Sequence, residues 1–115
     1  MELTNEIKIA ICGDVLDIAK AWYDYGLHDA AVELLKDKFN VYYNNKQYDR
    51  MQCFLKAALE NNDIPICFYI TLLEVSKYIK LMLGQVRVDL LNKALELSES
   101  NEEKDKINEI LNKLS

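Results

Sequence analysis

Apolar residues recur along the first part of the chain at steps of three and four, the spacing of one face of an α-helix. The main row consists of Ile7, Ile11, Val15, Ile18, Trp22 and Tyr25. A second row, Cys12, Leu16, Ala19 and Tyr23, widens the same face. We predict one helix from Thr4, a suitable N-cap, to Tyr25, uninterrupted at Gly13, with this face packed in the core. Gly26 follows where helices often end.

The same spacing predicts five further helices separated by short turns. We expect them at about 28–44, 47–61, 64–83, 85–98 and after residue 100. The stretch Ile64–Leu83 is apolar almost all round as far as Glu74, which predicts a buried central helix ended by Gly84. Ser100 with Glu103 three residues later forms a capping-box pattern for the last helix.

Short connections force successive helices to pack as antiparallel hairpins. The predicted fold is therefore all-α, with about six helices in a compact helical bundle or a short stack of hairpins. A chain of 115 residues has room for one core, so residues 1–115 are expected to form a single helical domain. Three glycines and one proline are too few for a turn-rich β fold.

Charge and hydropathy exclude several classes of partner. A net charge of −5 disfavours nucleic acid, because neutralised phosphates supply most of the affinity for it. The most apolar stretch, Ile64–Leu73, is too short to cross a bilayer, so no membrane association is expected. The acidic N-terminus lacks the pattern of a signal peptide, and the three cysteines suit reduced core thiols, so we expect a cytoplasmic protein.

Residues that carry chemistry are scarce. His28 is the single histidine, it follows a turn, and we expect it to face solvent or to help cap a helix. The sequence has no local nucleophile signature, no phosphate-binding glycine loop and no Cys/His metal spacing. We therefore expect a protein that is not an enzyme and that needs no cofactor or metal.

Two groups of residues are candidates for contact with a protein partner. Asp14, Asp17 and Asp24 form an acidic stripe on the first helix, which is either a solvated face or a dock for a basic peptide. Tyr43 and Tyr48 flank a polar turn, where aromatic side chains either pack or face a partner.

Residues 18–35 contain a spaced set of large, small and turn residues, namely Ile18, Ala19, Trp22, Gly26, Ala31 and Leu35. This pattern resembles one tetratricopeptide-type helical hairpin. Small residues let the two helices approach, and the aromatic side chain fills the gap beside them. The resemblance implies an interaction module whose first helices line a surface that receives a peptide or helix.

These observations favour a non-enzymatic protein-protein interaction module, either an adaptor or a chaperone-like binder. One alternative is a small acidic regulator, such as an antitoxin, an immunity protein or a phage-encoded inhibitor, that blocks a partner's active site or nucleic-acid-binding site. Another is a structural homodimer formed through the fourth helix or the last two helices.

Overall fold

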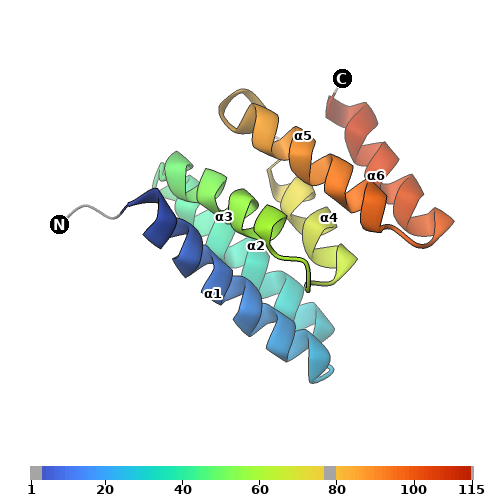
Figure 1. Ribbon diagram of the computed structural model, residues 1–115, viewed down its shortest axis with the longest axis horizontal. Helices are drawn as coiled ribbons and strands as arrows, with labels where there is room; N and C mark the ends of the chain where they lie inside the picture. Colours follow the sequence, from blue (N-terminus) through green and yellow to red (C-terminus); the bar gives the residue numbers. More distant parts are fainter. Residues whose placement is uncertain (1–3, 77–79, 115) are drawn as a thin grey trace.

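The computed structural model describes residues 4–76 and 80–114 and contains six α-helices within them (Figure 1). They are α1 (Asn5–Asp24), α2 (His28–Asn44), α3 (Tyr48–Glu60), α4 (Ile66–Val75), α5 (Lys80–Leu97) and α6 (Asn101–Leu114). The prediction of an all-α fold with about six helices is confirmed. In this described part of the chain, no helix combines the length and the apolar character that crossing a membrane requires.

The helices form two layers, because alternate helices pack side by side. α1 packs against α3 and α3 against α5, while α2 packs against α4 and α4 against α6 (Figure 1). The main contacts of α1 are with α2 and α3, and those of α2 are with α1, α3 and α4. The antiparallel α1–α2 hairpin therefore forms one end of the molecule, and α3 and α4 cover it on one side only.

The core lies between the two layers and contains side chains from all six helices. Its largest fully buried side chains are Tyr69, Phe39, Phe54, Phe68, Leu16, Leu35, Met51, Leu55, Leu72, Leu73 and Leu90. Tyr69 is buried with its hydroxyl satisfied, since Oη donates to the Asn61 carbonyl over 2.6 Å. The small residues Ala19, Ala31 and Ala58 are fully buried as well and allow the helices to approach closely.

Three local signals in the sequence have the expected effect on helix ends. The Thr4 hydroxyl accepts a 3.2 Å hydrogen bond from the Ile7 amide at the start of α1. Gly26 ends the first hairpin turn with a φ of 99°, a conformation that L side chains rarely adopt. The Ser100 hydroxyl accepts from the Glu103 amide over 3.1 Å, and the Glu103 carboxylate accepts from the Ser100 amide over 3.3 Å, which completes the capping box of α6.

The boundary between the fourth and fifth helices differs from the prediction. A single helix over 64–83 was expected, but α4 ends at Val75, and α5 already includes residues 80–83. The prediction also spans residues 77–79, which lie outside the described residues. Gly84 does not end a helix: it lies inside α5. A helical glycine costs only about 1 kcal/mol, which the burial of Leu90 and Ala94 on the same helix offsets.

Candidate functional site

The outer side of α1 carries a row of apolar side chains that we expected in the core. α1 is continuous through Gly13, as predicted, and in its second row Cys12, Leu16 and Ala19 are fully buried while Tyr23 is half-buried. The other row is exposed: Ile7 by 45%, Ile11 by 37%, Ile18 by 50%, Trp22 by 39% and Tyr25 by 86%. The prediction that these five side chains pack in the core was wrong, because α1 has neighbouring helices on only part of its circumference.

The exposed row of α1 points away from α3. Residues two apart on an α-helix lie about 200° apart, on nearly opposite sides. Ile9 and Gly13 line a shallow hollow shared with Ala57 of α3, and Ile11 stands two positions from each of them. The row is thus turned to the side that α3 leaves uncovered.

The exposed row of α2 lies on the same outer side of the hairpin. Leu27 precedes α2 and is 50% exposed, Leu34 is half-buried, and Val41 is 50% exposed. Val32 and Lys36 line a cleft with residues of α4, and Leu34 is two positions from both, so it lies opposite α4. The rows of α1 and α2 therefore face the same way, away from the rest of the molecule.

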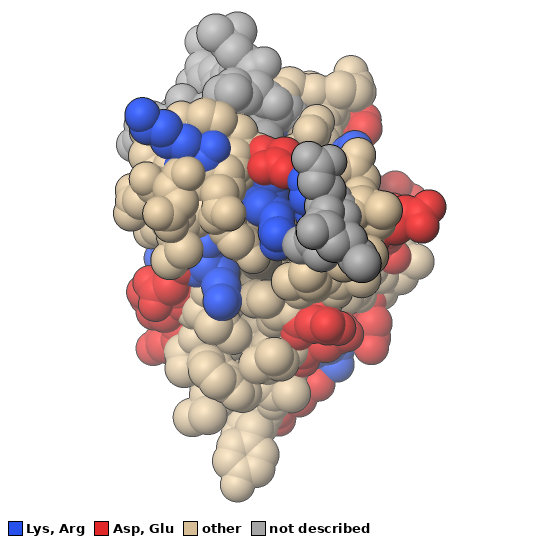
Figure 2. Space-filling model, turned by 90° about the vertical axis from the view of Figure 1, so that its left-hand side faces the viewer, with Lys and Arg blue, Asp and Glu red and all other residues tan. Residues whose placement is uncertain are grey.

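We call this surface the hairpin face. It consists of Ile7, Ile11, Ile18, Trp22, Tyr25, Leu27, Leu34 and Val41. Figure 2 shows the left-hand side of the molecule in Figure 1, and its lower half is mostly uncharged, with several acidic and a few basic groups among the uncharged residues. Single exposed apolar residues are normal on a protein surface, but several of them on the same side of two adjacent helices are typical of an interaction site.

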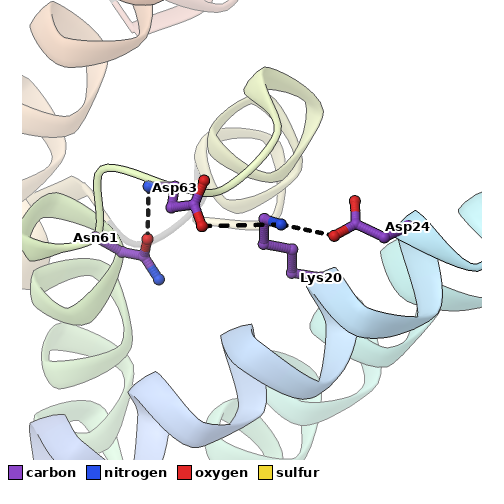
Figure 3. A network of polar contacts seen from close by, with 4 residues as sticks. All are labelled: Lys20, Asp24, Asn61 and Asp63. Atoms are coloured by element: carbon purple, nitrogen blue, oxygen red, sulfur yellow. Dashed lines mark hydrogen bonds and ion pairs between the residues drawn. The ribbon is translucent and has the colours of Figure 1, made fainter.

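A polar network joins the opposite side of α1 to the loop between α3 and α4. Lys20 Nζ lies 2.6 Å from Asp24 Oδ2 and 3.8 Å from Asp63 Oδ2 (Figure 3). Asp63 in turn donates its amide to Asn61 Oδ1 over 2.8 Å. The hydrogen bond with Asp24 raises the pKa of Lys20. The network thus links the C-terminal half of α1 to this loop.

The three aspartates predicted to bind a partner lie in different surroundings. Asp14 is exposed and lies beside Ile11 and Ile18 on the hairpin face, where no ion pair engages it among the described residues. Asp17 is exposed and borders the hollow between α1 and α3. Asp24 is exposed but engaged by Lys20. Of the three, only Asp14 is part of the apolar surface.

The two tyrosines at the turn between α2 and α3 also differ. Tyr43 is 47% exposed near the end of α2. Tyr48 opens α3 and is half-buried against the core. Neither belongs to the hairpin face, so the residues chosen from the sequence do not form one patch. Their role in binding stays a prediction.

The cysteines and the histidine are placed mainly as expected. Cys12 and Cys53 are buried free thiols, and burial raises the pKa of Cys12 to about 11. Cys67 is a half-buried free thiol in a cleft of about 550 Å³ between α2, α4 and α6. His28 is exposed and stacks on Tyr23 with the ring centroids 4.0 Å apart. Over the described residues, no group of three or more His, Cys, Asp or Glu side chains is placed to hold a metal ion.

Comparison of the chain with models of known families, with curated proteins and with solved structures found no match. The tetratricopeptide-type resemblance of residues 18–35 therefore stays a prediction.

Proposed function

We propose that the protein is a protein-protein interaction module that binds its partner through the hairpin face. The observation that carries the proposal is the exposure of large apolar side chains along the outer side of α1, with Leu27 and Val41 exposed on the same side of α2. Water contact with these side chains is unfavourable by roughly 25 cal/mol for each Å² of apolar surface, so covering them favours association. Trp22 and Tyr25 are of the residue types that most often dominate binding energy at interfaces.

The proposal is tested by removing two apolar side chains from the hairpin face and two from elsewhere. Ile11→Ser with Ile18→Ser alters the face, and Val88→Ser with Leu97→Ser alters α5, where the replaced side chains are 49% and 42% exposed. All four positions are at least partly exposed, so each double variant is expected to lose at most about 1–2 kcal/mol of folding stability. Urea unfolding checks that both remain folded.

Each variant carries an affinity tag and is purified from its native cells after crosslinking, and the co-purified proteins are quantified by mass spectrometry. We expect at least one protein to accompany the wild type and the α5 variant in equal amounts, and to fall at least about tenfold with the hairpin-face variant. If the two double variants retain the same proteins in the same amounts, the proposal is wrong.

The acidic-regulator alternative predicts a different response to salt. An interaction held mainly by charge weakens steeply between about 0.05 and 0.5 M salt, because the screening length shortens over this range. An interface held mainly by apolar contacts is expected to weaken far less over this range, even where a few charges flank it. Capture at both salt concentrations therefore separates the two hypotheses.

A further inference from the structure

The exposed row of α1 has the shape of a helix-packing seam. Its five residues recur at steps of four, seven, four and three, which places them within an arc of about 60°. From Ile7 to Tyr25 the row extends for about 27 Å, or five helical turns. A straight row this narrow suits the side chains of one partner helix of similar length.

The row of α2 supplies the second wall of the same site. Leu27, Leu34 and Val41 are spaced by seven residues, the repeat of a helix that packs along its length. On its inner side the hairpin already packs against one helix through both of its own helices, since α3 contacts α1 and α2. A helix on the outer side would rest on the same two helices from the opposite direction.

The charges beside the seam favour a basic occupant. Acidic residues outnumber basic ones on α1 and α2. Asp14 lies in the α1 row, and Asp37 stands three positions after Leu34 and four before Val41, so both border the apolar surface. Both carboxylates are exposed, and neither has an ion-pair partner among the described residues.

Three of the four lysines on α1 and α2 are engaged by carboxylates. Lys8 pairs with Asp49 over 2.6 Å, and Lys20 pairs with Asp24 over the same distance. Lys36 lies 3.7 Å from Glu33. Lys38 alone among the hairpin's lysines has no such partner in the described chain. Lys38 is exposed and stands four positions after Leu34 and three before Val41, so it borders the same row as Asp37. Beside the seam, the two carboxylates of Asp14 and Asp37 therefore outnumber this one unpaired cation.

The same charges disfavour a second copy of this chain as the occupant. Two copies joined through the hairpin face would bring two acidic surfaces together, each on a chain with a net charge of −5. Like charges that meet across an interface oppose association. A partner helix with lysine or arginine on both flanks of its apolar row is attracted by the same carboxylates that repel a second copy of this chain.

From these observations we infer that the hairpin face receives an amphipathic, basic helix of a protein partner, about five turns long. This inference rests on the proposed function and specifies its partner. The apolar side of the partner helix lies against the exposed rows of α1 and α2, with Trp22 near one end. Its basic flanks lie beside Asp14 and Asp37.

The probe is a tryptophan-free synthetic peptide of about 20 residues, which as a helix matches the length of the α1 row. Its leucines follow one another at alternating steps of three and four residues, and lysines lie on both flanks of this leucine row. Trp22 is the single tryptophan of the chain, so its fluorescence reports occupation of the site directly. We expect saturable binding to the full chain, accompanied by a blue shift of Trp22 emission as its ring loses water.

Two matched peptides test the chemistry of the occupant. One has glutamate in place of every lysine, and the other has the same composition with the leucines spread around the helix. Both are expected to bind at least about tenfold more weakly than the basic amphipathic peptide. Equal or tighter binding of either peptide overturns the inference, as does an absence of binding by the basic peptide.

Two matched protein variants test the place of binding. Asp14→Asn with Asp37→Asn is expected to weaken binding of the basic peptide about three- to tenfold and to reduce its salt dependence. Glu99→Gln with Asp105→Asn, which removes two exposed acidic groups far along the sequence, is expected to leave the affinity unchanged. An equal effect of both variants shows a general charge attraction and overturns the inference.

Sedimentation of the wild type and of the Ile11→Ser, Ile18→Ser variant tests the second copy. A monomer in both supports the inference. A wild-type dimer that this variant dissociates shows that a second copy covers the face, and the inference is then wrong. If cellular proteins still depend on the hairpin face but the peptides show no preference for basic charge, the inference fails while the proposed function stands.

Discussion

Arg87 of α5 donates its Nε–H to the hydroxyl oxygen of Ser76 over 2.7 Å, and both side chains are buried. Arg87 also donates from Nη2 to the Leu73 carbonyl over 2.7 Å, in the last turn of α4. Both acceptors are uncharged, and burial lowers the pKa of Arg87. The negative end of the α4 dipole stabilises a cation at this position. Arg87 thus caps α4 and ties it to α5.

Removal of the Ser76 hydroxyl is expected to destabilise the protein through Arg87. In Ser76→Ala the buried Nε–H loses its acceptor, and the expected loss is about 1–3 kcal/mol in the free energy of unfolding. In the Arg87→Met background the same change is expected to cost at least about 1 kcal/mol less, because no buried donor is left unpaired. Urea unfolding of the four proteins of this double-mutant cycle measures the coupling. A cost independent of Arg87 contradicts the capping role.

Alanine at two glycines is expected to change stability in opposite directions. Gly84 lies inside α5 in open space, so Gly84→Ala is expected to stabilise the protein by about 0.5–1 kcal/mol. Gly26 has a φ of 99°, so Gly26→Ala is expected to destabilise it by about 1–2 kcal/mol. Thermal unfolding of both variants gives the signs directly. Destabilisation by Gly84→Ala would mean that the helix ends at this glycine.

Replacement of Lys93 is expected to loosen the end of α3. Lys93 Nζ donates to the carbonyls of Leu59 and Asn61 and to Asn62 Oδ1, and it lies 5.5 Å from the centre of the Tyr69 ring. Lys93→Met removes these donors, at an expected cost of about 1–3 kcal/mol.

Lys104→Met serves as the control for the Lys93 variant, because it makes the same substitution on the exposed side of α6. Its effect on the free energy of urea unfolding is expected to stay within about 0.5 kcal/mol. Similar losses in both variants would show that Lys93 contributes nothing specific to the end of α3.

Alkaline pH is expected to destabilise the protein partly through Cys12. Burial raises the pKa of this thiol from 9.0 to about 11, and a negative charge on Cys53 acts in the same direction. Because the folded state disfavours the thiolate, this contribution is complete below pH 9 and is lost as the pH rises towards 11. At pH 10 the loss is about 1 kcal/mol.

The Cys12→Ala variant isolates this contribution. It is expected to be less stable than the wild type at pH 7, because a cavity replaces the buried sulfur. Between pH 8 and pH 10, however, its free energy of unfolding should fall by about 1 kcal/mol less than that of the wild type. Urea unfolding under reducing conditions at both pH values provides the comparison, and parallel losses would assign the pH dependence to other groups.

Most of the secondary structure was predictable because its causes are local. The Thr4 cap, the Gly26 turn and the pair formed by Ser100 and Glu103 act within a few residues, so the sequence contains all the information they need. Gly84 was misinterpreted because a glycine both ends helices and is tolerated within them. The contacts made by the rest of α5 decide between the two outcomes.

The sequence by itself determined that α1 has two apolar rows, but not which of them is covered. Both rows satisfy the periodicity of a helix, and their difference arises only from the position of the neighbouring helices. α2 and α3 cover the row of Leu16 and Ala19, and the row of Ile18 and Trp22 is left exposed at the end of the stack. Burial is a property of contacts between distant segments, and for this reason only the tertiary structure decided where the hairpin face lies.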